Sequence, residues 1–482
     1  MLASAERKWF ALALLCAVQF MVVLDIAIVN VALPSIQTDL GFSQENLQWV
    51  ISAYALLFGG FLLLGGRLAD LLGRRRIFIA GTILFTVSSL LAGLAWSEGS
   101  LIGARGLQGL AAAIISPAAL SILMTTFAEG KERNAALGAW GGVGAFGAVA
   151  GVLLGGVLTD ALSWQWIFFV NVPIGLAALG LTPLLLGESR DLRARSFDVP
   201  GAVTVTGGLV ALVYAITQGQ SNGWGSAATI GVFAVSAALL AAFLVWESRA
   251  AEPLMPFSIF RLRTVTGANV AGLILGTAMF AMFLMLTLYM QQVLGYSAMK
   301  TGVAYLAVAA TAILWSAVAA QLVNRVGVKP VLVTGMAFLT TGLVYFTQVS
   351  VGGSYLGDLL PGFLLISVGL GFSFVPISIA ALAGVRDMEA GLASGLINTS
   401  QQVGGAVGIA VLSTIATTRT SDEVASGTAL PFALTDGFQA AFITGAAIAL
   451  VGILVALFVV RREDLTPQEA ADGEPAFELE AA

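Results

Sequence analysis

Apolar stretches long enough to cross a lipid bilayer recur from one end of this 482-residue chain to the other. A membrane-spanning helix needs about 20 consecutive, mainly apolar residues. Fourteen stretches meet this need, at residues 10–32, 48–66, 77–96, 101–127, 134–158, 166–187, 199–219, 226–247, 268–291, 301–323, 331–349, 359–384, 392–415 and 437–460. The sequence therefore predicts an all-helical, polytopic membrane protein with fourteen spans.

The composition indicates that lipid is the solvent of this chain, because 58% of its residues are hydrophobic and only 10% are charged. An ordinary soluble domain carries about 25% charged residues. The chain has no histidine and a single cysteine, Cys16. This excludes histidine metal sites, serine–histidine and cysteine–histidine catalysis, and an internal disulfide. No phosphate-binding loop is present for ATP-driven pumping. We expect neither an enzyme nor a metal or organic cofactor.

The basic residues predict the orientation of the spans. Of the 22 lysines and arginines, all but three fall on the side of the N-terminus. Lys300 and Arg419 fall on the other side, and Arg105 lies inside a span. Because cytoplasmic loops carry the excess of lysine and arginine, both termini are expected in the cytoplasm of a multi-pass protein of the cell membrane.

The chain also repeats weakly. GRLADLLGRRR (66–76) lies between spans two and three, and QLVNRVGVK (321–329) lies at the matching place among the last six spans. This pattern predicts a six-helix bundle (1–187), two added helices with flanking loops (188–260), a second six-helix bundle (261–460) and an acidic, disordered tail (461–482). A substrate path would then run between the bundles near the midplane.

Asp25 is the residue that most directly suggests a function, because it is an acid deep within the first span. Intramembrane ionisable residues are expensive, and they commonly belong to proton relays or ion paths. Arg105, which cannot lose its proton, needs water or an acid, and Asp25 is its nearest candidate in a folded bundle. Gln108 lies on nearly the same helix face as Arg105. The alternative is a neutral, purely structural acid and a structural tie.

Two glycine-containing motifs come next. In the loop after span two, Gly66 allows close helix approach, Asp70 can accept hydrogen bonds, Gly73 permits a tight turn and Arg74 can form a fork with a carboxylate. The plain alternative is a basic topogenic loop. In span five, Gly147, Gly151 and Gly155 are four residues apart and share one face, which favours close packing of another helix.

The loop motif resembles the loop signature of the major facilitator superfamily, in which the aspartate and the arginine form a latch between the halves. Over essentially the whole chain, the resemblance is to the 14-span drug:proton antiporters of that superfamily. It rests on LDIAIVNVALPSI (24–36), RGLQGLAAA (105–113), WQWIFFVNVPIG (164–175), FDVPG (197–201), QQVLGYSAMKTG (291–302) and GLASGLINTSQQVGGAVG (391–408). The resemblance implies a major-facilitator-type fold of two six-helix bundles plus two extra helices.

The resemblance also assigns roles to individual residues. It places Asp25 and Arg105 in proton coupling, and it matches the antiporter motif at Gly138, Gly147, Gly151, Gly155 and Gly156. The usual proline of that motif is Val152 here, which bears on exchange rather than on transport itself. Leu71 stands where a basic residue is usual, and Gln165 and Gln401 stand where arginines are common. Candidate cavity-lining residues are Asn30, Gln108, Met282 and Asn398.

We therefore expect a proton-coupled exporter of hydrophobic or amphipathic compounds that works by alternating access. Its partners would be a small-molecule substrate, protons and the lipid bilayer, without nucleic acid, and it would act as a monomer. Spans nine to fourteen contain no acid in their interiors, which favours neutral, amphipathic or monocationic substrates. The alternatives are a symporter or uniporter of a specific metabolite, and a membrane protein that senses or assembles without transport.

Overall fold

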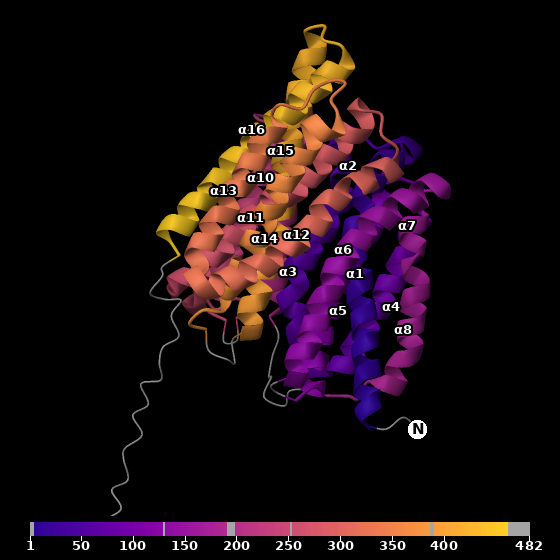
Figure 1. Ribbon diagram of the computed structural model, residues 1–482, viewed down its shortest axis with the longest axis vertical. Coiled ribbons are helices and arrows are strands. Elements are labelled where there is room, and N and C mark those ends of the chain that lie inside the picture. Colours follow the sequence, from indigo (N-terminus) through magenta and orange to yellow (C-terminus); the bar gives the residue numbers. More distant parts are fainter. Residues whose placement is uncertain (1–3, 129–130, 190–197, 251–252, 386–389, 461–482) are drawn as a thin grey trace, which may run out of the picture.

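The computed structural model describes residues 4–128, 131–189, 198–250, 253–385 and 390–460, and all the regular structure of these residues is helical (Figure 1). The predicted acidic tail lies outside the described residues. The helices are α1 (Ser4–Leu40), α2 (Gln44–Leu47), α3 (Trp49–Leu72), α4 (Arg74–Gly93), α5 (Glu98–Thr126), α6 (Lys131–Ala161), α7 (Trp166–Phe169), α8 (Asn171–Leu185), α9 (Val199–Asn222), α10 (Ala227–Glu247), η1 (Phe257–Arg261), α11 (Arg263–Leu288), η2 (Tyr289–Val293), α12 (Ala298–Val326), α13 (Val328–Phe346), η3 (Tyr355–Leu359), α14 (Leu360–Leu382), α15 (Ala390–Ala425) and α16 (Leu430–Phe458).

Each of the fourteen predicted spans coincides with a long helix, or with a short and a long helix in series. Twelve helical segments are both long and apolar enough to cross a membrane. The helices α6 and α15 have ample length, at 31 and 36 residues, but fall outside that set of twelve. Within α6 the stretch Phe146–Ala161 is apolar, whereas amide and hydroxyl residues make α15 more polar than the other long helices. The fold class is confirmed, whereas the count of fourteen spans is supported by helix length alone at α6 and α15.

The last two predicted spans are shorter than the helices that contain them. The sequence predicts an end at residue 415 and a start at 437, whereas α15 continues to Ala425 and α16 begins at Leu430. The two helices project together beyond the rest of the bundle (Figure 1). Hydropathy misses this hairpin because TTRTSDEVASG (417–427) is polar, yet nothing in it breaks a helix before Gly427.

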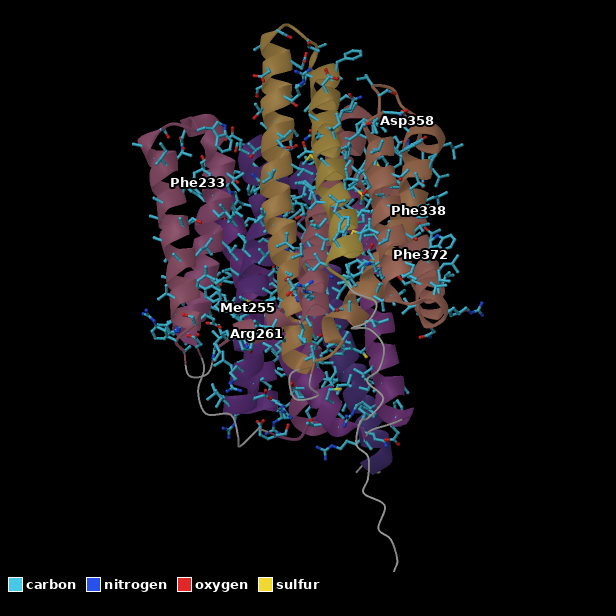
Figure 2. All side chains as sticks on the ribbon, turned by 90° about the vertical axis from the view of Figure 1, so that its left-hand side faces the viewer. Phe233, Met255, Arg261, Phe338, Asp358 and Phe372 are labelled. Atoms are coloured by element: carbon cyan, nitrogen blue, oxygen red, sulfur yellow. The ribbon has the colours of Figure 1, made fainter. Side chains whose placement is uncertain are left out.

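The long helices pack as two groups with a pair at their seam. In the first group α1 packs on α6, and α5 packs on α3 and α4; in the second, α11 packs on α15, and α14 on α12 and α13. The pair α9–α10 stands at one side, where Phe233 marks α10 (Figure 2), and α9 contacts both α3 and α15. This packing has the form that was predicted, while the domain limits at 187 and 260 stay predictions.

The two groups also meet at one end of the bundle. We call the end at which α1 begins the near end, and the end at which α1 stops the far end. At the far end, Gln291 Nε2 donates to the Val31 carbonyl at 2.8 Å, and Gln292 Nε2 donates to Gln37 Oε1 at 3.1 Å. The Met299 amide also donates to Asp160 Oδ2 at 2.8 Å. These contacts join the first group to the second across the far end.

Candidate functional site: a buried ion pair and its surroundings

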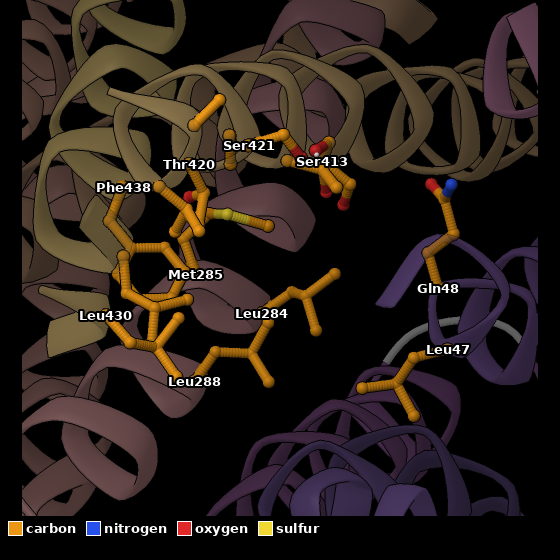
Figure 3. A pocket seen from close by; sticks show the side chains of 15 residues that line it. Leu47, Gln48, Leu284, Met285, Leu288, Ser413, Thr420, Ser421, Leu430 and Phe438 are labelled. Carbon is orange, nitrogen blue, oxygen red and sulfur yellow. Dashed lines mark hydrogen bonds between the residues drawn. The ribbon is translucent and has the colours of Figure 1, made fainter. Parts of the chain in front are cut away.

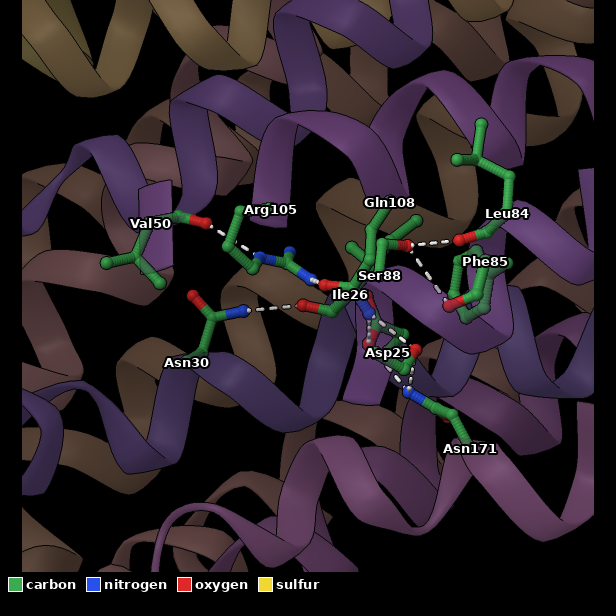
Figure 4. A network of polar contacts seen from close by, with 11 residues as sticks. Asp25, Ile26, Asn30, Val50, Leu84, Phe85, Ser88, Arg105, Gln108 and Asn171 are labelled. Carbon is green, nitrogen blue, oxygen red and sulfur yellow. Dashed lines mark hydrogen bonds and ion pairs between the residues drawn. The ribbon is translucent and has the colours of Figure 1, made fainter. Parts of the chain in front are cut away.

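Asp25 and Arg105 form a buried ion pair inside the first group of helices (Figure 4). Arg105 NH1 lies 2.5 Å from Asp25 Oδ2, and the two residues are 1% and 0% exposed. The other carboxylate oxygen accepts hydrogen bonds from Gln108 Nε2 at 3.0 Å and from Asn171 Nδ2 at 2.8 Å. Both oxygens of the carboxylate are therefore fully engaged by donors from α5 and α8.

Arg105 is held as tightly as its acid. Its Nε donates to the Val50 carbonyl at 2.9 Å, and NH1 also donates to Gln108 Oε1 at 2.9 Å. The guanidinium lies 4.5 Å from the centre of the Tyr54 ring, which adds a cation–π contact. A buried pair of this kind offsets a large desolvation penalty only while all its partners remain. Removal of either charge would leave the other one uncompensated.

The predicted contact between Asp25 and Arg105 is present, and Gln108 lies beside both. Sequence reasoning missed Asn171, Ser89 and Tyr54; Ser89 Oγ accepts from Gln108 Nε2 at 2.8 Å. A search for every polar residue in an apolar stretch would have found Asn171 and Ser89. Asn30 is not part of this network, because its amide donates to the Ile26 carbonyl of its own helix at 3.2 Å.

The glycine face of α6 packs against α1 directly beside Asp25. A Cβ on Gly151 would lie 2.7 Å from Ala27 Cβ and 2.9 Å from the Leu24 carbonyl oxygen. A Cβ on Gly155 would lie 2.7 Å from the Ile28 carbonyl oxygen. These positions must be glycine for the backbones to approach this closely. Gly147, Gly151 and Gly155 thus pack closely, as predicted, against the stretch of α1 from Phe20 to Ile28, which includes the acid.

A second side of α6 contacts the other group of helices. A Cβ on Gly156 would lie 2.7 Å from Met299 Cα of α12, and one on Gly302 would lie 2.7 Å from the Val152 carbonyl oxygen. Helix α6 thus touches the acid-bearing helix on one side and the second group on another. Gly138 lies in α6, but its surroundings fall outside what the structure describes.

The loop between α3 and α4 shows local pairing rather than a latch between the halves. Arg74 Nε and NH2 donate to Asp70 Oδ1 at 3.0 and 2.8 Å. Gly73 has a φ of 108°, as a tight turn there requires. The adjoining Arg75 amide donates to Glu188 Oε1 at 3.1 Å, just beyond α8. Among the described residues, the contacts of Asp70 and Arg74 stay on this side of the molecule, so the implied latch is not engaged here.

Two hollows lie at or near the far end, and Asp25 lines neither of them. One, of about 460 Å³, lies between the junction of α2 with α3 and the helices α11, α15 and α16. The other, of about 780 Å³, is an open polar depression that includes Gln37 and Gln165. Met282 is fully buried, and the neighbouring Met285 lines the first hollow instead. Asn398 is exposed, and its amide donates only to the Ser394 carbonyl at 2.9 Å. A Cβ on Gly66 would make only an ordinary contact, 3.4 Å from Pro117 Cβ.

Among the described residues, no group of three or more acids, histidines and cysteines is placed to hold a metal ion. What the arrangement can do is take up one proton at a carboxylate, release an arginine from its partner, and so alter how five helices, α1, α3, α4, α5 and α8, pack together.

Comparisons with known proteins agree with this architecture. The chain is 41% identical over 452 residues to a puromycin resistance protein of Streptomyces alboniger, covering 93% of this chain and 90% of the relative. It is 42% identical over 420 residues to a cephamycin export protein of Amycolatopsis lactamdurans, covering 86% of each.

Solved structures share the fold at low identity. A peptide transporter of the POT family in complex with sulfate has a TM-score of 0.67 at 15% identity, covering 96% of this chain and 99% of that chain. A bacterial homologue of the lysosomal transporter Spinster has a TM-score of 0.65, also at 15% identity. A family model, described as Major Facilitator Superfamily, matches residues 15–409. With relatives of this identity and coverage, the match shows that the chain belongs to the Major Facilitator Superfamily.

Proposed function

We propose that this protein exports hydrophobic or amphipathic small molecules across the cell membrane in exchange for protons. The observation that carries the proposal is the fully buried pair of Asp25 and Arg105, the one place in the described helices where a proton-binding group and a fixed positive charge meet out of reach of water. The resistance and export functions named for the relatives above support the choice of substrate class.

Protonation of Asp25 would change the balance of forces in the first group. The carboxylate holds Arg105, Gln108 and Asn171, and a neutral carboxylic acid would hold these donors more weakly. Hydrogen bonds to a charged partner are worth about 1.5–3 kcal/mol, roughly twice those between neutral groups. Loading one proton therefore loosens the contacts that draw α5 and α8 towards α1.

Helix α6 offers a physical route from the proton site to the second group. Its glycine face touches α1 at Leu24 and Ile28, and its Gly156 touches α12 at Met299. A shift of α1 would thus be transmitted to the contact between the two groups. Substrate binding that favours one arrangement of the groups would favour one protonation state equally, because such coupling is reciprocal.

The structure supplies one of the two conformations that alternating access requires. Here the groups are joined at the far end, while the loop of Asp70 and Arg74 is paired within its own side. The second conformation would part the far end and bring the near ends together. In that state the loop could engage the second group as the family resemblance implies.

We place both termini and the near end in the cytoplasm. Among the described residues, the basic side chains gather at the near end, and Lys300 and Arg419 lie towards the far end. A cysteine at Ser354 should react with an impermeant maleimide added to intact cells, and a cysteine at Ser189 should not, both in a Cys16→Ala background. Reaction at position 189 from outside would overturn this orientation.

Counterflow of substrate and protons tests the transport mode. Inverted membrane vesicles with an acidic interior should concentrate puromycin, and a protonophore should abolish the accumulation. A uniporter would only equilibrate puromycin, and a proton symporter would need the opposite gradient. An empty-vector membrane preparation is the control. Accumulation that ignores the pH gradient would contradict the proposal.

Val152 favours the symporter or uniporter as the second candidate. It stands where the family usually has a proline, and α6 runs without interruption from Lys131 to Ala161. A helix without that proline lacks a ready site for a bend. The substitution Val152→Pro should therefore leave the gradient dependence of the wild type unchanged if the protein is already an antiporter, and create that dependence if it is not.

A further inference from the structure

The far-end hollow that contains Met285 has the character of a binding site that is separate from the ion pair (Figure 3). Its volume of about 460 Å³ is within the range of small-molecule pockets, roughly 300–1,000 Å³. Its walls come from both groups of helices: Gln48 from the start of α3, Leu284 from α11, Ser413 from α15 and Phe438 from α16. A ligand in it would contact both groups at once.

The orientation of the Gln48 amide is fixed by its neighbours. Nε2 donates to the Glu45 carbonyl and to Thr217 Oγ1, each at 3.0 Å. The Thr217 hydroxyl donates its hydrogen bond to the Val213 carbonyl at 2.8 Å, so it can act only as an acceptor towards Gln48. Both partners are therefore acceptors, and the amide cannot be flipped. This leaves Oε1 as the free atom of a side chain that is 2% exposed and lines the hollow.

A second buried polar atom lies in the same wall. Ser413 is 6% exposed, and its Oγ has no hydrogen-bond partner among the described residues. Figure 3 shows Gln48 and Ser413 towards the upper and right-hand edges of the hollow, with Leu47 next to Gln48 and with Leu288, Leu430 and Phe438 on the left. Native proteins rarely leave buried polar atoms unpaired, so each such atom calls for a partner. A ligand donor facing Gln48 Oε1 would supply one.

The remaining walls restrict the chemistry of that ligand. Apart from Gln48, the side chains that line the hollow are apolar or hydroxyl-bearing, and none of the lining side chains carries a charge. An ion would lose its hydration there without gaining a counter-charge. The ligand is therefore an uncharged, largely hydrophobic molecule with an N–H or O–H donor.

We propose that this hollow is a second ligand site, formed by the start of α3 together with α11, α15 and α16, for neutral hydrophobic molecules that donate a hydrogen bond to Gln48 Oε1. The site goes beyond the proposed proton coupling and does not depend on it, since it shares no residue with the network of Asp25. In the orientation proposed above, it lies towards the outer side of the membrane. Because Gln48 is hydrogen-bonded to Thr217 of α9, binding of a molecule at Gln48 would also be linked to the position of the added helices α9 and α10.

Binding of two matched probes to the full-length purified protein tests this site. The first probe is radiolabelled N-phenyl-1-naphthylamine, which is neutral and has one N–H, and the second is its N-methyl derivative, which has none. Scintillation proximity should show that the wild type binds the first probe about three- to tenfold more tightly, as one hydrogen bond implies. Equal affinity for the two probes would overturn the proposal.

Variants locate the site. Gln48→Met keeps the length of the side chain but removes the acceptor, so it should abolish the preference between the probes. Ser413→Ala should keep the preference between the probes, because the single N–H of the first probe is donated to Gln48 Oε1, and Thr334→Ala, which removes an exposed hydroxyl elsewhere, should keep it too. Ala416→Phe should fill the hollow and abolish binding of both probes. An unchanged affinity in Ala416→Phe would place the bound probe elsewhere and overturn the proposal.

The Asp25→Asn protein should keep the binding preference, because its change lies outside the hollow. This arm separates the two proposals. If Asp25→Asn loses pH-driven transport but keeps the preference for the first probe, the proposal of a second ligand site is supported. If the wild type shows no preference between the probes, that proposal fails, and the proposal of proton coupling is not affected. If Gln48→Met fails to fold, as judged by gel filtration, the probe pair on the wild type and on Ala416→Phe still decides the result.

Discussion

The two polar sites of this molecule differ in how their buried groups are satisfied. Around Asp25 the carboxylate and the guanidinium are paired with each other and with Gln108, Asn171 and the Val50 carbonyl, and Asp25 lines neither of the two hollows described above. In the far-end hollow the groups are neutral, and Gln48 Oε1 and Ser413 Oγ have no partner among the described residues. At the first site the charged groups are paired within the protein, although the neutral atoms Asn171 Oδ1 and Tyr54 Oη beside them have no partner among the described residues. At the second site the unpaired atoms belong to residues that line a hollow large enough for a ligand.

The difference follows from the cost of burying each kind of group. An unpaired charge in an apolar interior is far more costly than an unpaired amide or hydroxyl oxygen, which costs about 1–3 kcal/mol. The protein can therefore leave neutral acceptors unpaired and available to a ligand, but it must pair its buried charges with groups of its own. A proton changes the first site by altering a charge, and a molecule changes the second by filling a space.

The largest effect is expected from Asp25→Asn. Asparagine is nearly isosteric but cannot carry a proton, so accumulation driven by a pH gradient should be lost. The change also leaves the buried Arg105 without its counter-charge and so lowers stability, but the protein that remains folded, as judged by gel filtration, should keep substrate binding and downhill exchange. The measurement is uptake into inverted vesicles with an imposed gradient, beside equilibrium binding on the same preparation. Asp422→Asn, the same change at an exposed acid of α15, is the matched control. If Asp25→Asn accumulated substrate as the wild type does, Asp25 would not be the proton-coupling site, and the proposed difference in function between the two sites would be wrong.

Arg105→Ala should impair coupling and also destabilise the fold. It leaves the Asp25 carboxylate buried without its counter-charge, a loss of about 3–5 kcal/mol for a broken buried pair. The double variant Arg105→Ala with Asp25→Asn should regain part of that stability, because no uncompensated charge remains. Thermal unfolding of the purified proteins measures both. Equal stability of Arg105→Ala and the wild type would show that the pair is not held as tightly as its geometry indicates.

Gly151→Ala should disturb the Asp25 site and spare the far-end hollow. The new methyl group would lie 2.7 Å from Ala27 Cβ, so α1 and α6 must separate, at a cost of about 1–3 kcal/mol for overpacking. Gly103→Ala is the control, since a Cβ there meets nothing within 4 Å. Transport should fall severalfold in the first variant only, with unchanged preference between the two naphthylamine probes. Equal transport by the two variants would refute the proposed route through α6.

The smallest effect is expected from Asp70→Asn, which lies outside both sites. The change keeps the shape of the side chain and removes the charge that pairs with Arg74, in a partly exposed position where such a pair contributes about 0–1 kcal/mol. Transport should slow while the amount of protein in the membrane stays the same. A transport rate equal to that of the wild type at matched expression would reduce this segment to a topogenic loop.

The charged site could be predicted further from sequence than the neutral one. Asp25 and Arg105 are an acid and a cation within predicted membrane spans, where a charge without a partner is costly. Their contact could therefore be predicted from their charges and their positions in the spans. Gln108 follows from helical spacing. Asn171 does not, because it comes from α8, and only the packing of four helices shows that it reaches the same oxygen as Gln108. The latch inferred for Asp70 likewise depends on which conformation the groups adopt.

The sequence by itself determined the solvent of this protein, the positions of its long helices and the need of one acid for a partner, because hydropathy and charge are local properties of the chain. Only the tertiary structure decided the far-end hollow. Its walls come from residues as far apart in the chain as Leu47 and Phe438, and the free oxygen of Gln48 is set by Thr217 in a third segment. An unpaired neutral atom leaves no mark in the sequence, since whether it is paired depends on which helices pack around it.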